Sequence, residues 1–231
     1  MRKLRFHEKG MLIKMKKLLY KELHLAASPL SYFFLAAALL TLIPGYPILL
    51  GAFFTTLGIF YSYQTMRENN DITYSLLLPI PKAAVVKSKF AFTVFIELCS
   101  FFAMTVLTAL RMTLFKNVQP YTANPLMGAN LVFLGYVLLI FGLFNLIFVR
   151  GFFRTAYYFG KPFILYCIVC MLVIAVAEAL YHFPGMEALN AFGFDHIGVQ
   201  LSFLAAGIVC FLVLSYMAVK QSVKMFEKLD M

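Results

Sequence analysis

Few residues in this 231-residue sequence carry catalytic or metal-binding chemistry, and they do not gather. The four histidines are spread from position 7 to position 196, so they make no ligand group. Cys167 and Cys170 form a Cys-x-x-Cys pair in an apolar run with no second pair and no neighbouring histidine. Zinc binding or thiol redox chemistry needs more ligands or a thioredoxin-like setting. We therefore interpret both thiols as small apolar packing residues.

Motifs that bind phosphate or build hydrolase sites are also missing from the sequence. It holds no Gly-x-x-x-x-Gly-Lys-Ser/Thr phosphate loop, no His-Glu-x-x-His zinc motif and no Gly-x-Ser-x-Gly nucleophile turn. We therefore expect no catalytic residue, no metal and no cofactor in this chain, and no ATP hydrolysis by a phosphate loop.

Glu97 and Asn145 are the polar residues whose positions carry most chemical information. Glu97 stands in an apolar run, about 12 Å from Lys89 if the run is helical, which is near the middle of a membrane. A charge at that depth costs at least a few kcal/mol. One interpretation is a protonated or hydrogen-bonded carboxyl that faces another helix, with Asn145 as its partner. The other is a substrate or gating residue on a translocation pathway.

The elements that must position these residues follow from composition. Hydrophobic residues make up 62% of the chain and charged residues 13%, whereas soluble domains hold about 45–50% and about 25%. A chain of 231 residues cannot hide that much apolar surface, so lipid must cover most of it. Only helices and closed barrels span lipid. The apolar runs do not alternate as barrel strands do, so the sequence predicts an all-α membrane protein.

Six apolar runs match the roughly 17–25 residues that one membrane crossing requires. They cover residues 25–43, 48–66, 90–110, 131–149, 163–181 and 199–219. Breaks that contain proline or glycine separate several of them. The sequence thus predicts six transmembrane helices in a single domain over residues 1–231, followed by a cytoplasmic tail at 220–231.

Lysine and arginine set the orientation of this layout. Of the 20 such residues, 18 lie before the first run, between runs two and three, between runs four and five, or after run six. With six spans these segments share one side of the membrane, so we expect both termini in the cytoplasm. The net charge of +10 is then a topology signal that meets anionic lipid, and we expect no nucleic-acid partner.

Residues 1–24 hold a periodic pattern besides their charge. Leu12, Met15, Leu19 and Leu23 recur every three to four positions, and lysines fill the opposite side. This spacing predicts a basic amphipathic helix that lies along the inner membrane surface. It serves either as an anchor for the first span or as a lever that also contacts a cytoplasmic partner.

Residues 67–89 form a cytoplasmic insert between runs two and three, longer than the few residues that a plain turn needs. Asp71 is the expected N-cap of a short helix over residues 72–78, which Pro79 is expected to end. The lysines that follow are expected at the lipid headgroups. The leucines at 76–78 would face water or a partner, and grouped exposed apolar residues indicate docking.

This insert and the start of the chain resemble one family, the membrane subunits of ATP-binding-cassette type 2 exporters. The similar segments are residues 18–34, Glu68-Asn-Asn70, Leu76-Leu-Leu78, Pro79-Ile80 and Val86-x-x-Lys89. Pro81 stands where a small polar residue is common in the family, and Lys82 replaces its usual arginine.

The resemblance implies that the insert is a coupling helix, which contacts a separate ATPase subunit that binds ATP and magnesium. The residues it places at this contact are Glu68, Asn69, Asn70, Asp71, Tyr74, Leu76, Leu77, Leu78 and Pro79. It also implies two permease chains, identical or homologous, that alternate between inward-facing and outward-facing states in a prokaryotic plasma membrane. Glu97 and Asn145 are then candidate translocation-pathway residues.

Two other classes stay open beside the exporter. A membrane scaffold or immunity-type protein would use the same insert to bind a partner without transport. An intramembrane enzyme would need paired acids, histidines or a Ser/Lys couple at one depth, and we find none.

Overall fold

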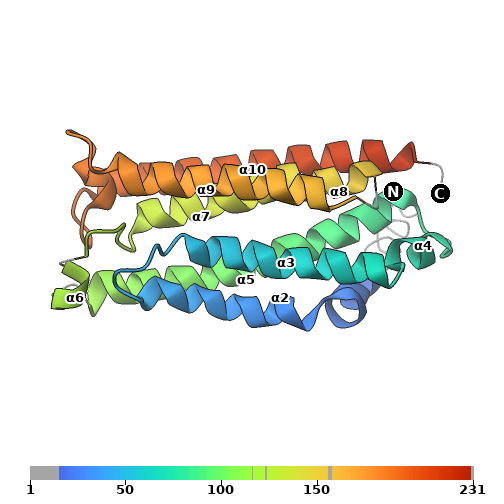
Figure 1. Cartoon of the computed structure of the whole chain (residues 1–231), viewed down its shortest axis with the longest axis horizontal. Coiled ribbons are helices and arrows are strands. Elements are labelled where there is room, and N and C mark those ends of the chain that lie inside the picture. The colour runs from blue at the N-terminus through green and yellow to red at the C-terminus, as the bar shows by residue number, and fades with distance from the viewer. Residues whose placement is uncertain (1–15, 116, 123, 156–157, 230–231) are drawn as a thin grey trace, which may run out of the picture.

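The computed structural model describes residues 16–115, 117–122, 124–155 and 158–229 of the chain. Within these ranges the protein is an elongated bundle of helices without strands (Figure 1), so the all-α expectation is confirmed. Residues 1–15, which hold much of the predicted amphipathic helix, and residues 230–231 of the predicted tail lie outside the described residues.

The helices follow one another with short connections. In chain order they are η1 (Glu22–Ala26), α2 (Pro29–Phe33), η2 (Phe34–Leu42), α3 (Leu50–Glu68), α4 (Asp71–Leu76), α5 (Lys82–Thr113), α6 (Gln119–Thr122), α7 (Leu131–Phe144), η3 (Asn145–Val149), α8 (Arg150–Thr155), α9 (Gly160–Leu180), η4 (Glu187–Asn190) and α10 (Ile197–Glu227). The elements η1 and η3 are π-helical, and η2 and η4 are 3-10 helices. We call Lys16–Ala26, which contains η1, the N-terminal helix.

Fewer helices qualify as membrane spans than the six predicted. Four described stretches are long and apolar enough to cross a membrane: Lys82–Thr113, Leu131–Thr155, Gly160–Leu180 and Ile197–Glu227. A fifth crossing results if the N-terminal helix and Pro29–Leu42, which are bent by 94°, count as one span. The helix α3 stands where the second span is predicted, but it does not meet the same test of apolar composition.

Burial explains why α3 is so polar. The Thr55 hydroxyl lies 2.8 Å from that of Ser100 on α5, and the Thr56 hydroxyl lies 2.8 Å from that of Tyr166 on α9. All four of these side chains are fully buried. Hydroxyl groups on a helix surrounded by other helices form bonds between helices instead of facing lipid. An average of hydropathy along α3 alone does not register that neighbouring helices cover it.

The first predicted span begins later than expected. Its helix starts at Pro29 and not at residue 25, because Ser28 caps it by accepting a hydrogen bond from the Leu30 amide. Most of it is η2, a nine-residue 3-10 helix. A 3-10 helix rises about 2.0 Å per residue and an α-helix about 1.5 Å, so Pro29–Leu42 extends about 26 Å instead of about 21 Å. The 3-10 geometry therefore brings a short segment closer to the thickness of a bilayer core.

The two ends of the bundle differ in charge. The helices α4 and α8 and the C-terminal end of α10 lie at one end, whereas α6 lies at the other (Figure 1). The elements at the α4 end carry the described lysines and arginines, apart from Arg111 near the opposite end of α5. We call the α4 end the basic end. The helix α10 continues to Glu227, so most of the predicted tail 220–231 is an extension of the last helix.

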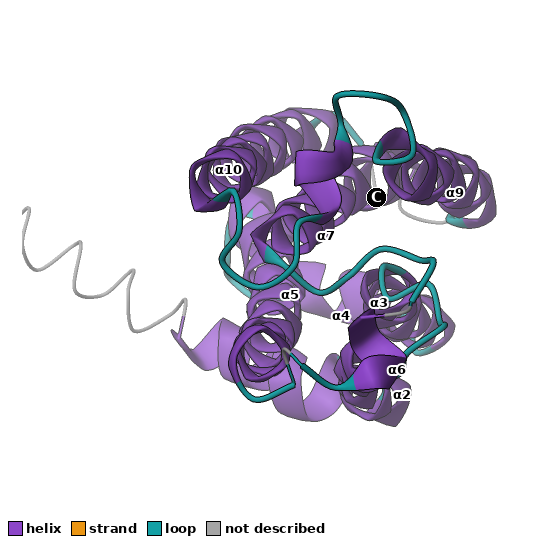
Figure 2. Ribbon diagram, turned by 90° about the vertical axis from the view of Figure 1, so that its left-hand side faces the viewer, coloured by secondary structure: helices purple, strands orange, loops and turns teal. Residues whose placement is uncertain are grey.

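The helix α7 forms the centre of the bundle and is in contact with α3, α5, α9 and α10 (Figure 2). The helix α10 packs most closely against it. A Cβ at Gly207 of α10 would lie only 2.6 Å from the Gly135 carbonyl oxygen of α7, so the two backbones are nearly in contact there. Small residues let helix backbones approach in this way and are the usual contacts between membrane helices.

Candidate functional site

The short helix α4 stands at the basic end, between α3 and α5. The helix α3 ends at Glu68, and Asn70 turns the chain with a left-handed backbone conformation (φ 51°). Asparagine tolerates this conformation better than most residues do. Asp71 is the first residue of α4 and not its N-cap, which corrects the sequence prediction: Asn70 takes the cap position and makes no side-chain cap bond.

The return from α4 to the third predicted span also differs from the prediction. The helix α4 ends at Leu76, two residues earlier than expected, and Leu77 is its C-cap. The helix α5 begins at Lys82, directly after Pro81, and runs without a break to Thr113. Residues 83–89, which the sequence predicts as part of the insert before the third run, are therefore the first turns of a 32-residue helix.

One side of α4 is exposed and apolar, and we call Tyr74, Leu77 and Leu78 the α4 face. These side chains are 66%, 77% and 48% exposed, respectively. Leu76 is only half-buried and packs against the core, so just two of the three predicted leucines are exposed. The other predicted contact residues are exposed at Glu68, Asn69, Asn70 and Pro79 and half-buried at Asp71. A compact apolar patch with a polar rim is a typical docking surface.

Beneath α4 lies a group of ion pairs formed by Lys21, Glu22, Asp71 and Lys89, which we call the charge cluster; Glu22 and Lys89 are fully buried, and Lys21 and Asp71 are partly exposed. The Lys89 ammonium donates to Glu22 Oε2 at 3.0 Å and to Asp71 Oδ2, and the Lys89 side chain is fully buried. The Lys21 ammonium lies 2.7 Å from Asp71 Oδ1 and donates to the Ser75 hydroxyl at 2.7 Å. The expectation that Lys89 sits at the lipid headgroups is therefore wrong.

The charge cluster is electrically balanced, with two cations and two anions. Burial raises the pKa of Asp71, but the charge of Lys89 and hydrogen bonds from Lys21 and Lys89 outweigh it, so the pKa lies below its ordinary value. Removing one member of a buried ion pair leaves its partner uncompensated and costs about 3–5 kcal/mol. The cluster therefore holds its members together tightly.

The cluster joins α4 and α5, which follow each other in the chain, to the N-terminal helix, which lies far from both in the sequence. Lys21 and Glu22 belong to the N-terminal helix, Asp71 begins α4, and Lys89 belongs to α5. Any displacement of α4 therefore acts both on α5 and on the segment that precedes α2. Sequence reasoning missed Lys21 and Glu22. The available signal was that Glu22 is the only acid between Glu8 and Glu68, on a helix otherwise rich in lysine.

A second polar contact lies deep in the bundle. The Asn145 amide donates to Glu97 Oε2 at 2.9 Å and to the Ser215 hydroxyl at 3.1 Å, which links α5, η3 and α10. Glu97 and Asn145 are fully buried within this chain. The predicted contact between them is thus present, and their role in a pathway stays a prediction. Asn145 begins the π-helical turn η3, and such turns are frequent at functional sites.

The described residues offer no group of three or more His, Cys, Asp or Glu side chains that could hold a metal ion. Within the described residues, the basic end combines an exposed apolar face on α4 with the charge cluster beneath it.

Comparison with known proteins bears on this arrangement. The family model described as ABC-2 family transporter protein matches residues 16–227, which include the N-terminal helix, α4 and the whole helical bundle. No curated protein and no solved structure matches the sequence.

Proposed function

The chain belongs to the ABC-2 family of transporter proteins and is a multi-pass membrane permease, and we propose that it is the membrane subunit of an ATP-binding-cassette exporter. Separate ATPase subunits bind ATP and magnesium and drive it through α4. The observation that carries this proposal is the exposed α4 face lying directly over the charge cluster. A partner that binds the α4 face is connected, through the ion pairs of Asp71, to α5 and to the N-terminal helix.

Force on α4 would reach the membrane by two routes. Asp71 is paired with Lys89, near the start of α5, a helix of 32 residues and so about 48 Å long. Asp71 is also paired with Lys21 of the N-terminal helix, which is bent by 94° from Pro29–Leu42. A push on α4 then tilts α5 as a lever and pulls on the first span. This is a mechanical route from nucleotide binding to a change of access, in line with alternating-access transport.

The topology that we propose is six spans with both termini in the cytoplasm. The concentration of lysine and arginine at the basic end favours placing that end inside the cell. The N-terminal helix then runs along the inner membrane surface, and α4 reaches a cytoplasmic partner. The plasma membrane of a prokaryote is the proposed location.

One chain is too small to enclose a sizeable pathway, so we propose a complex of two permease chains, either identical or homologous. The helices α9 and α10 expose many apolar side chains, which leaves lateral surface for lipid or for the second chain. Glu97 and Asn145 remain candidate pathway residues in this arrangement, exposed to substrate only if α5 and η3 separate.

The proposal is tested by charging the α4 face. We expect Leu77→Asp together with Leu78→Asp to abolish co-purification with the partner ATP-binding-cassette ATPase, and to abolish the ATP turnover that the complex supports. The matched control is Leu114→Asp, because Leu114 is an equally exposed leucine (70%) at the opposite end of α5. Normal capture and normal turnover in the double variant would refute the coupling role.

The same experiment separates the exporter from a scaffold or immunity-type protein. A partner that binds the α4 face without any ATP turnover or transport would indicate the scaffold.

A further inference from the structure

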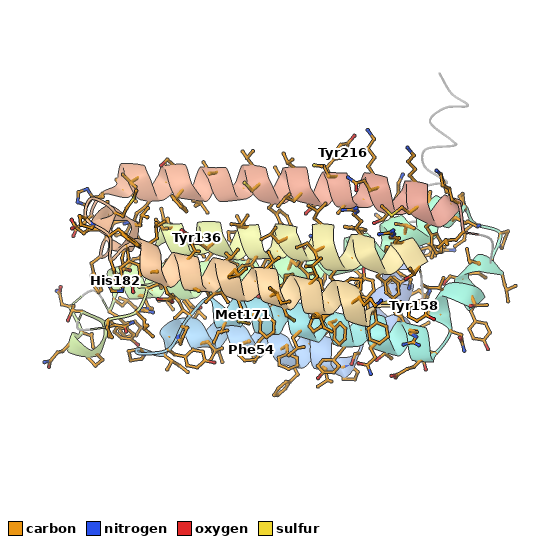
Figure 3. The ribbon with its side chains drawn as sticks, turned by 45° about the horizontal axis from the view of Figure 1, so that its top comes forward. Phe54, Tyr136, Tyr158, Met171, His182 and Tyr216 are labelled. Carbon is orange, nitrogen blue, oxygen red and sulfur yellow. The ribbon has the colours of Figure 1, made fainter. Side chains whose placement is uncertain are left out.

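A second feature of the basic end, separate from α4, is a cavity of about 500 Å³ between α8 and the start of α9. Arg150, Arg154 and Lys161 line it together with Thr155 and Tyr158, and none of the described residues in its wall is acidic. Figure 3 places Tyr158 at the basic end, with Met171 farther along α9 toward the middle of the bundle.

The cations of this cavity converge because of where they stand in the chain. Arg150 and Arg154 are four residues apart on α8, so they project from the same face of the helix. Lys161 comes from the first turn of α9. The two helices approach closely at Gly151, where an added Cβ would lie only 2.6 Å from the Pro162 Cβ. Gly151 thus permits an approach that brings all three cations to one cavity.

These three cations differ from the lysines of the charge cluster. Among the described residues, Lys21 and Lys89 are paired with carboxylates, whereas Arg150, Arg154 and Lys161 form no ion pair. Like charges held together in this way repel one another. An anion in the cavity would remove the repulsion, and guanidinium groups suit phosphate especially well.

The rest of the cavity wall is apolar. Leu146 and Ile147 of η3 and Leu165 of α9 form it. Leu165, Ile168 and Leu172 are all more than half exposed and lie along one side of α9, leading away from the cations for about 10 Å. The site therefore combines a phosphate-sized group of cations with an apolar track suited to an acyl chain.

We propose that this cavity binds an anionic phospholipid of the leaflet at the basic end. Its phosphate lies among Arg150, Arg154 and Lys161, and an acyl chain lies along α9. Basic pockets between membrane helices are known to recognise such headgroups. The apolar track favours lipid over a free phosphate compound. The proposal requires membrane insertion of the bundle, and it stands apart from coupling to an ATPase.

The test uses the full-length protein in detergent, with phosphatidylglycerol as the probe and phosphatidylcholine and inorganic phosphate as comparison ligands. Bound lipid is counted by native mass spectrometry, and affinity is taken from the rise in unfolding temperature on titration. We expect Arg150→Gln, Arg154→Gln and Lys161→Gln together to weaken phosphatidylglycerol binding about a hundredfold. That loss equals about 3 kcal/mol at about 1.4 kcal/mol per tenfold change in Kd, or about 1 kcal/mol for each cation near an anionic headgroup.

The matched control removes three lysines at the C-terminal end of α10 and its cap, through Lys220→Gln, Lys224→Gln and Lys228→Gln. We expect this control to leave phosphatidylglycerol binding unchanged. Because the triple cavity variant changes a helix junction, the single variant Arg154→Gln, at an exposed position, serves as a second test with a smaller loss. Binding within twofold of the parent in both cavity variants would overturn the proposal. If the control variant loses phosphatidylglycerol affinity as strongly as the triple cavity variant, the lipid is bound by diffuse surface charge. If inorganic phosphate raises the unfolding temperature as much as phosphatidylglycerol does, the cavity is a site for small anions. Either result overturns the lipid assignment.

Discussion

Replacing Lys89 by methionine tests whether the charge cluster holds the basic end together. The substitution removes a fully buried ammonium, which lies 3.0 Å from Glu22 Oε2 and also contacts Asp71. Asp71 keeps Lys21 as a partner, whereas the buried Glu22 keeps Lys21 at 3.3 Å and a long hydrogen bond from the Ser88 hydroxyl at 3.4 Å. Breaking a buried pair from one side costs about 3–5 kcal/mol. For a chain of 231 residues, about 2–4 °C of unfolding temperature corresponds to each kcal/mol, so we expect a fall of about 6–20 °C.

The assay is thermal unfolding of the purified protein in detergent, followed by circular dichroism because the chain has no tryptophan. Lys87→Met is the matched control: Lys87 is exposed, two residues away on α5, and its loss should change stability by no more than about 0.5 kcal/mol. Adding Glu22→Gln to Lys89→Met removes the uncompensated carboxylate, so the double variant should be more stable than the sum of the single effects predicts. If Lys89→Met unfolds at the same temperature as Lys87→Met, the cluster does not stabilise the basic end.

Three further predictions follow from the structure. The pKa of Asp71 is lowered in the fold, so the stability that this carboxylate contributes is complete above its ordinary pKa of 3.8 and is lost as the pH falls below that value. Unfolding temperatures measured from pH 6 to pH 3 should therefore fall. The fall should be smaller in the Asp71→Asn variant, which lacks the titrating group. Gly207→Ala should destabilise the bundle by about 1–3 kcal/mol in the same unfolding assay, because its Cβ would meet the α7 backbone, whereas Gly198→Ala, with open space around it, should not. Asn145→Val should leave the Glu97 carboxyl without its amide donor and lower the unfolding temperature; a loss of transport with unchanged stability would instead favour a pathway role.

The sequence predicted the parts of this protein that depend on local composition. Apolar runs and the one-sided distribution of lysine and arginine indicated a helical membrane protein, and the family assignment from residues 18–34 and 68–89 is confirmed. The position of α4 between α3 and α5 also followed from the Asp71–Pro79 pattern. These features are set by residues close together in the chain, so they are visible without the fold.

The features that the sequence did not predict depend on contacts between distant residues. Lys89 looked like a headgroup lysine, because nothing near it in the chain indicates that Glu22 and Asp71 surround it. A helix over residues 48–66 was predicted, but its coverage by neighbouring helices, which the contact between Thr55 and Ser100 illustrates, was not. The 3-10 geometry of η2 likewise has no sequence signal in a run of alanine and leucine.

The most direct test of the central claim is to locate the α4 face during the nucleotide cycle. A cysteine introduced by Leu77→Cys, in a background with the four native cysteines replaced, should resist a membrane-impermeant maleimide added to intact cells. In membranes it should crosslink to the partner ATPase with a yield that changes on ATP binding. Labelling of this cysteine from outside the cell, or a crosslink yield of zero while the ATPase remains bound elsewhere, would contradict the account.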